Sequence, residues 1–149
     1  MKLKILFGTG IAIGSEISPQ LLVNIFVPNT PLHDGAVVIS NNKIVAAACM
    51  LPLASDTDIA KELGTRHRAA IGISKESDAI AIVVSEETGK ISIAKDGTLI
   101  ADVKGETLKK ILIKNIIDKR FDKARISKIE RLKSINFGKD KKEEDNKKD

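Results

Sequence analysis

Two short clusters of polar residues carry side chains suited to nucleotide chemistry. The first cluster is His33-Asp34-Gly35-Ala36, and the second is Thr65-Arg66-His67-Arg68. A carboxylate such as that of Asp34 binds divalent metal ions, and a pair of guanidinium groups binds phosphate oxygens. Together the two clusters indicate a site for a nucleotide and a divalent metal ion.

The second cluster is placed where an anion is favoured. Gly64 is expected to end one helix and Thr65 to cap the next, so that residues 66–68 fall in a first turn with free N–H groups. Cationic side chains are unfavourable at this end of a helix unless a negative ligand neutralises them, as a polyphosphate would. The alternative is an ordinary solvated face with one arginine paired to Glu62.

The first cluster lies where the chain turns into an apolar run, so Asp34 is expected at the mouth of a strand. Gly35 allows a backbone or a ligand to approach closely. Asp34 can there bind Mg²⁺ or Mn²⁺ and accept a proton from a sugar hydroxyl, with His33 as a second ligand or an orienting group. The alternative is that Asp34 and Gly35 form a plain turn.

The elements that must position these clusters alternate between helices and strands, which predicts an α/β fold. We predict helices over residues 18–26, 58–63, 66–74 and 107–121, and strands over residues 36–40, 43–50, 79–85 and 90–95. Asn41-Asn42 predicts a tight hairpin turn. Glu86 and Glu87 follow a predicted strand, and ligands of α/β proteins usually bind at strand ends.

Charge divides the chain into three parts. Residues 1–103 hold 9 Lys and Arg against 11 Asp and Glu, residues 104–138 hold 11 against 4, and residues 139–149 hold 5 of each. The middle part predicts a basic, solvated helical segment, and the last part predicts a disordered charged tail. The basic excess lies outside the two clusters, and the chain has no Trp or Tyr to stack on bases, so we expect no nucleic-acid partner.

The cysteine content and the hydropathy of the chain indicate its cellular compartment. The single cysteine excludes an internal disulfide and suits a reducing cytoplasm. Cys49 lies in an apolar run and is expected to be a buried small hydrophobe, so the chain offers no evident covalent nucleophile. No stretch approaches the ~20 apolar residues that span a bilayer, and we expect the chain as it stands in the cytoplasm.

Four blocks in order resemble the signature of the diadenylate cyclase domain, especially its membrane-anchored bacterial CdaA type. The blocks are Pro28–Val37, Leu51–Leu53, Lys61–Ala70 and Val83–Gly89. The resemblance runs from about Thr9 to about Leu99. It implies an enzyme that condenses two ATP molecules into cyclic di-AMP with release of pyrophosphate. The implied core, residues 1–103, is a mixed β-sheet flanked by helices.

The resemblance also implies roles for individual residues. Asp34 would bind a divalent metal ion, Mn²⁺ or Mg²⁺, and help to deprotonate the attacking ribose 3′-hydroxyl, with His33 supporting the metal. Glu86 or Glu87 would add a carboxylate, and Glu86 is favoured. The remaining nucleotide contacts would come from Gly35 and Ala36 beside the nucleotide, Thr65, Arg66, His67, Arg68 and Ser85 at the phosphates, and Met50 and Leu51 at the adenine.

The expected assembly follows from the single set of site residues in each chain. A cyclic product with two linkages needs two such sets face to face, which predicts a two-fold homodimer. The resemblance further implies a phosphoglucosamine mutase and a membrane regulator as partners. It also implies a parent protein anchored in the membrane, with this domain facing the cytoplasm. Domains of this family begin with a further helix and strand, so we expect an N-terminally truncated form.

Two other functions stay open at this point. A truncated and catalytically weak or inactive domain would bind ATP or cyclic di-AMP as a regulatory module. A module that uses the basic residues 104–138 on nucleic acid or a membrane surface would bind with strong dependence on salt.

Overall fold

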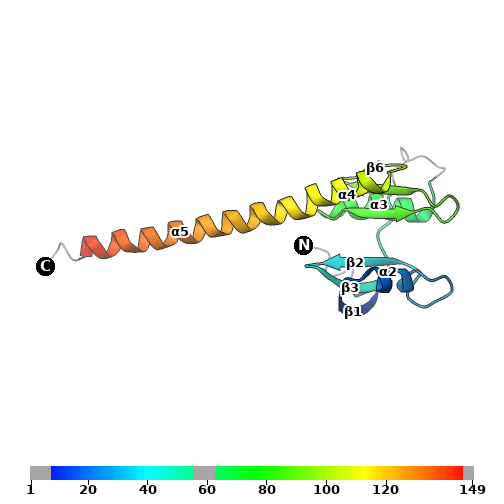
Figure 1. Cartoon of the computed structure of the whole chain (residues 1–149), viewed down its shortest axis with the longest axis horizontal. Coiled ribbons are helices and arrows are strands. Elements are labelled where there is room, and N and C mark those ends of the chain that lie inside the picture. Colours follow the sequence, from blue (N-terminus) through cyan, green and yellow to red (C-terminus); the bar gives the residue numbers. More distant parts are fainter. Residues whose placement is uncertain (1–7, 56–62, 146–149) are drawn as a thin grey trace. The chain divides into compact units, whose positions relative to one another are not determined.

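The computed structural model describes residues 8–55 and 63–145, which belong to two compact units (Figure 1). Unit 1 comprises residues 1–103 and unit 2 comprises residues 104–149. Unit 1 combines helices with β-sheets, and the predicted α/β class is confirmed. Its described strands form two separate three-stranded sheets rather than one mixed sheet, and every pair of neighbouring strands is antiparallel.

The first sheet has the strand order β1-β3-β2 and carries helix α2. The bounds are β1 Ile11–Glu16, α2 Pro19–Ile25, β2 Ala36–Ser40 and β3 Lys43–Cys49. Ser18 caps the helix by accepting a hydrogen bond from the Leu21 nitrogen at 3.0 Å, and Pro19 opens the first turn, as the sequence predicts. Ile25 of α2 packs with Ile44 and Ala47 of β3 in a small buried core.

Two backbone irregularities lie at opposite ends of the β2–β3 pair, and the second of them lies beside the first cluster. Asn41 and Asn42 both have positive φ, 50° and 62°, which is the backbone of the predicted tight hairpin. Ala48 has φ of 52°, and the β2–β3 register shifts next to it. The resulting bulge bends the end of β3, a feature often found beside functional sites.

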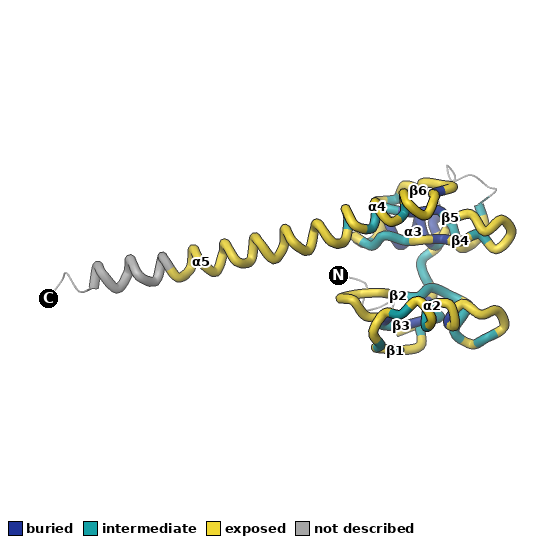
Figure 2. The backbone as a smooth tube through the Cα atoms, viewed as in Figure 1, coloured by how far each residue is buried: buried dark blue, intermediate teal, exposed yellow. Residues whose placement is uncertain are grey.

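The second sheet has the order β4-β5-β6 and carries helix α3. The bounds are α3 Thr65–Glu76, β4 Ala81–Val84, β5 Ile91–Lys95 and β6 Thr98–Ile100. Ala70 and Ile71 of α3 pack on Val83 and Ala94, and Figure 2 shows such buried residues along α3, β4 and β5. Strand β6 was not predicted, although the turn before it, Asp96-Gly97 with two positive φ angles, is a typical hairpin signal.

The start of α3 corrects one expectation. The N-cap is Gly64, with extended backbone and no side-chain cap, so Thr65 is the first helical residue and not the cap. Residues 66–68 nevertheless lie in the first turn of α3, as predicted. The helix predicted over residues 58–63 falls almost entirely outside the described residues.

Unit 2 is helical throughout its described part. It consists of α4 Gly105–Leu112, the π-helical segment η1 Ile113–Asp118 and α5 Lys119–Asp145. The helix predicted over residues 107–121 is therefore confirmed but much longer, and it is widened at η1. There the Asn115 side-chain amide donates to the Ile111 carbonyl at 2.8 Å. Helix α5 continues to Asp145, into the segment predicted to be a disordered tail, and that disorder stays a prediction.

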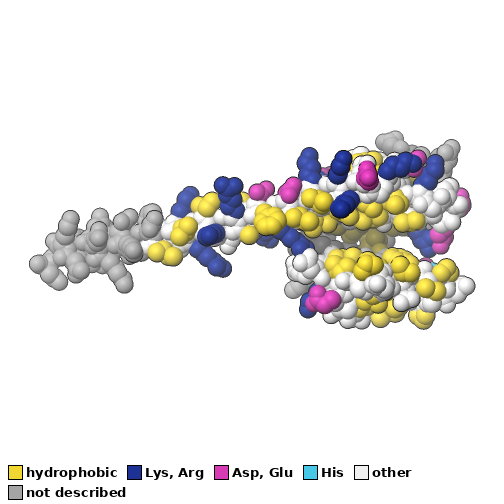
Figure 3. Space-filling model, viewed as in Figure 1, with side chains coloured by type: hydrophobic (Ala, Val, Ile, Leu, Met, Phe, Trp, Pro, Cys, Tyr) yellow, Lys and Arg dark blue, Asp and Glu magenta, His cyan; other side chains and the backbone are white. Residues whose placement is uncertain are grey.

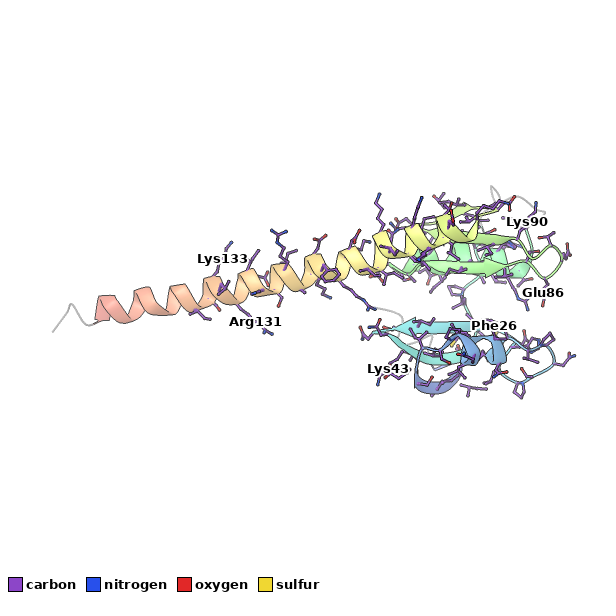
Figure 4. The ribbon with its side chains drawn as sticks, viewed as in Figure 1. Phe26, Lys43, Glu86, Lys90, Arg131 and Lys133 are labelled. Carbon is purple, nitrogen blue, oxygen red and sulfur yellow. The ribbon has the colours of Figure 1, made fainter. Side chains whose placement is uncertain are left out.

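The surface of unit 2 is strongly solvated. Every described side chain over residues 116–135 is exposed, and Figure 3 shows Lys and Arg side chains along the helix between apolar ones. Arg131 and Lys133 project from α5 in Figure 4. Within the described ranges, no helix has the length and apolar character needed to cross a membrane.

Candidate functional site

The turn before β2 orients the His33 ring. The His33 Nδ1 atom lies 2.7 Å from the Thr30 carbonyl oxygen, and the His33 backbone nitrogen donates to the same oxygen at 3.3 Å. A carbonyl only accepts, so Nδ1 carries a proton, and in the neutral ring Nε2 is then the nitrogen with the lone pair. The Thr30 hydroxyl donates to the Val27 carbonyl at 2.8 Å, which ties this turn to the end of α2. Metal-binding histidines are commonly oriented in this way.

Asp34 is exposed at the mouth of β2, as predicted, and makes no hydrogen bond or ion pair with another described residue. The adjacent Gly35 has φ of +132°, and a Cβ atom there would lie 2.6 Å from the Ala48 carbonyl carbon. Only glycine allows this approach, so the turn is pressed against the bulged end of β3. The Asp34 carboxylate is thus held on a firm turn and is available to a ligand.

The second cluster is joined to the turn between β4 and β5. The Arg66 guanidinium pairs with the Glu86 carboxylate at 2.5 Å, and these side chains are 45% and 71% exposed. Figure 4 shows Glu86 on that turn. The alternative partner considered for an arginine, Glu62, lies outside the described residues. Glu86 is therefore engaged with one of the predicted phosphate-binding residues.

The turn that carries Glu86 is ordered by its own hydrogen bonds. The Ser85 hydroxyl accepts from the Thr88 nitrogen at 3.3 Å, and the Gly89 nitrogen donates to the Ser85 carbonyl at 2.9 Å. Gly89 has φ of +69°, a conformation that favours glycine. Glu87 is exposed on this turn. Ser85 thus acts as a brace for the turn and is half-buried beside β4.

Arg68 contacts the segment Met50–Ala54, which includes the two residues predicted to border the adenine. The Arg68 Nε atom donates to the Ala54 carbonyl at 3.2 Å, and the Ala54 nitrogen donates to the Arg68 carbonyl at 3.0 Å. At the other end of the segment, the Met50 nitrogen donates to the Thr9 hydroxyl at 3.1 Å. Met50 is exposed and Leu51 is half-buried.

The predicted site residues fall into two groups on two sheets. His33, Asp34, Gly35 and Ala36 adjoin the first sheet, whereas Thr65, Arg66, His67, Arg68, Ser85 and Glu86 adjoin the second. Over residues 8–55 and 63–145, no three His, Cys, Asp or Glu side chains come together as a metal-binding group. The structure brings Glu86 to Arg66 and does not assemble it with His33 and Asp34 within one chain.

Cys49 matches its sequence-based interpretation. It is a buried free cysteine, and burial raises the pKa of its thiol. A raised pKa keeps the thiol protonated and weakly nucleophilic at neutral pH. Cys49 is therefore part of the packing.

Sequence reasoning missed Gly72 and Thr9 as supports of the Met50–Ala54 segment. Gly72 lies in the interior of α3, and a Cβ atom there would overlap the Pro52 carbonyl oxygen. A glycine inside a helix lowers helix stability and often has a packing reason, so Gly72 did carry a usable signal. Thr9 carried none, because its hydroxyl reaches Met50 only through the fold.

Comparison with known proteins identifies the family. A family model described as DisA bacterial checkpoint controller nucleotide-binding (DAC) matches residues 1–99. The cyclic di-AMP synthase CdaA of Bacillus subtilis is 58% identical over 104 residues, which cover 70% of this chain and 38% of that protein.

Two solved structures are also similar. A double mutant of DacA from Staphylococcus aureus is 50% identical with a TM-score of 0.75, over 77% of each chain. A protein from Bacillus cereus, described as a hypothetical membrane spanning protein, is 52% identical with a TM-score of 0.63, over 64% of this chain and 47% of that one. The chain spans about 40% of the length of the curated relatives it matches.

Proposed function

Because this chain belongs to the DAC domain family of diadenylate cyclases, we propose that it condenses two ATP molecules into cyclic di-AMP. The observation that carries the proposal is that unit 1 holds both a carboxylate suited to a metal ion and two arginines suited to phosphates. The exposed Asp34 carboxylate, which has no hydrogen-bond or ion-pair partner among the described residues, lies beside an oriented His33, and Arg66 and Arg68 lie in the first turn of α3. These are the two requirements of phosphoryl transfer without a covalent nucleophile.

The proposed reaction consists of two displacements. In each, the 3′-hydroxyl oxygen of one ATP attacks the α-phosphorus of the other, one P–O bond forms, and the bond to the β-phosphate breaks. Two pyrophosphates leave, and the two hydroxyl protons are released. We assign acceptance of the hydroxyl proton to Asp34, because its carboxylate is exposed and has no described partner to compete for it.

His33 and Asp34 fit a divalent metal ion. Nε2 of His33 is left with a lone pair by the bond from Nδ1 to Thr30, and the Asp34 carboxylate is exposed. An imidazole with a carboxylate suits Mn²⁺ and also accepts Mg²⁺. When bound, such an ion would polarise the phosphoryl oxygens and lower the pKa of the hydroxyl. Glu86, paired with Arg66, fits the positioning of that arginine better than a place on the metal.

The other predicted residues would hold the nucleotide. Thr65, Arg66, His67 and Arg68 at the start of α3 and Ser85 on the β4–β5 turn would contact the phosphates, where backbone N–H groups also favour an anion. Gly35 and Ala36 would lie beside the nucleotide, and Met50 and Leu51 would border the adenine.

The proposal includes the assembly and its setting. Each chain has one Asp34, whereas a cyclic product with two linkages needs two such carboxylates, so the proposed catalytic unit is a two-fold homodimer. Phosphoglucosamine mutase and a membrane regulator are candidate partners through the family resemblance. A similar solved protein is described as membrane spanning, which supports a membrane-anchored parent with this domain on the cytoplasmic side.

The test is product analysis by chromatography after incubation with ATP and Mn²⁺, with Asp34→Asn as the variant. We expect the wild type to form cyclic di-AMP and pyrophosphate in a 1:2 ratio. Asp34→Asn should form none, because an amide neither accepts the proton nor binds the metal strongly. Its thermal unfolding should match the wild type, since Asp34 is exposed and has no described partner.

Two results would contradict the proposal. An active Asp34→Asn protein would remove this carboxylate from the mechanism. A folded wild type that binds ATP without forming product would support the regulatory-module alternative instead.

A further inference from the structure

Helix α3 supports more than the phosphate side of the proposed site. Arg68 and Gly72 are four residues apart and therefore lie on one face of α3, one turn from each other. Both contact the segment Leu51–Ala54, which follows Met50. This face of the helix is thus a platform for the segment proposed to border the adenine.

At Arg68 the contact is a pair of opposed hydrogen bonds. The Ala54 nitrogen donates to the Arg68 carbonyl at 3.0 Å, and the Arg68 Nε atom donates to the Ala54 carbonyl at 3.2 Å. Ala54 itself is 6% exposed and belongs to the buried cluster with Ala70 and Ile71. Because Arg68 Nε donates to the Ala54 carbonyl, a phosphate would be bound by the two terminal guanidinium nitrogens of Arg68.

At Gly72 the contact is steric. A Cβ atom on Gly72 would overlap the Pro52 carbonyl oxygen and would lie 2.9 Å from its carbonyl carbon and 3.0 Å from the Ala54 nitrogen. These neighbours are backbone atoms, which cannot rotate away as a side chain can. The helix therefore tolerates glycine here, at a cost of about 1 kcal/mol relative to alanine in a helix interior, so that the segment can lie directly on it.

We propose that Arg68 and Gly72 position the segment Leu51–Ala54 on helix α3 and thereby determine the selectivity of the site for adenine over guanine. The proposal rests on the proposed function for the location of the base. Selectivity follows because a base is distinguished by the polar and apolar groups that face it, so a shift of the segment that carries those groups reduces the difference between the two bases. Arg68 and Gly72 act here as positioning residues, through the segment they hold.

The first test is Gly72→Ala, with Gly105→Ala as the matched control. A Cβ atom at Gly105 meets nothing within 4 Å, so the control adds the same methyl group to open space. For Gly72→Ala we expect the ratio of the ATP to the GTP binding constant, measured by calorimetry, to fall about tenfold. The Ala54 amide should also exchange its hydrogen at least about tenfold faster. Gly105→Ala should change neither quantity.

The second test is Arg68→Lys, which keeps the positive charge but removes the Nε donor. We expect the preference for ATP over GTP to fall. Binding of inorganic tripolyphosphate should also weaken, because lysine does not reproduce the contacts of a guanidinium with phosphate, but that loss is common to ATP and GTP and cancels in their ratio. A residue that served the phosphates alone would weaken ATP, GTP and tripolyphosphate to the same extent and leave base preference unchanged. That result would overturn the proposed role of Arg68.

The outcomes separate this inference from the proposed function. A wild type that prefers ATP in binding but makes no cyclic di-AMP would contradict the proposed function and still allow both tests. Unchanged Ala54 exchange and unchanged base preference in Gly72→Ala would overturn the inference. So would a wild type that binds ATP and GTP equally well.

Discussion

Arg66 illustrates how a side chain can be prepared for a ligand before the ligand arrives. Two arginines in the first turn of α3 are locally unfavourable, because that end of a helix repels positive charge. The Glu86 carboxylate on the β4–β5 turn pairs with Arg66 and so neutralises part of this positive charge. An exposed pair of this kind contributes at most about 1 kcal/mol to stability, so its main effect is on where the guanidinium lies.

Because the Arg66–Glu86 pair adds little stability but positions Arg66, we expect Arg66→Ala and Glu86→Gln to affect different quantities. Arg66→Ala should raise the KM for ATP by about tenfold or more, because a charged hydrogen bond to phosphate is lost. Glu86→Gln should change the free energy of unfolding by less than about 1 kcal/mol and leave unchanged the Mn²⁺ concentration for half-maximal activity. Steady-state kinetics with titrated Mn²⁺ measures both. A large shift in the Mn²⁺ requirement of Glu86→Gln would place Glu86 on the metal instead.

At the scale of elements, α3 is the central support, and its far end is anchored by Ser74. The Ser74 side chain is fully buried, donates to the Ile71 carbonyl at 2.9 Å and accepts from the Gly97 nitrogen at 3.0 Å. The second bond links α3 to the β5–β6 turn. The helix is therefore attached to the sheet at one end and carries the candidate phosphate-binding residues at the other.

Ser74→Ala should destabilise unit 1 by about 1–3 kcal/mol, because the Gly97 N–H would lose its partner in a half-buried place. Chemical denaturation measures the change. Ser134→Ala is the matched control, because the Ser134 hydroxyl donates a similar hydrogen bond to the Arg131 carbonyl on exposed α5. This substitution should change the free energy of unfolding by less than about 0.5 kcal/mol. Equal effects of the two substitutions would show that Ser74 does not anchor α3.

At the scale of the whole molecule, the proposed product has two linkages, whereas each chain has one Asp34. If the catalytic unit is a two-fold dimer, specific activity should rise with protein concentration until the dimer is saturated. Excess Asp34→Asn chain should also suppress cyclic product, because a mixed dimer can form only one of the two linkages. Initial rates over a hundredfold range of protein concentration provide the test. Constant specific activity, unaffected by the variant, would contradict the dimer.

Local patterns in the sequence were sufficient for features governed by neighbouring residues. The Ser18-Pro19 helix start, the Asn41-Asn42 turn and the α/β class depend on capping, backbone preference and periodicity, all of which act over a few residues. The ordered blocks around Asp34 and Arg66 were also sufficient for the family.

Only the tertiary structure decided which of these residues meet. Arg66 pairs with Glu86, 20 positions away, Arg68 holds Ala54 across 14 positions, and Thr9 bonds to Met50 across 41. Each contact depends on the packing of one element on another, and no local preference of either residue encodes it. Residue types and their order thus determined the chemistry available to this protein. The fold decided which of these side chains contact one another, and it left the Asp34 carboxylate exposed and without a partner among the described residues.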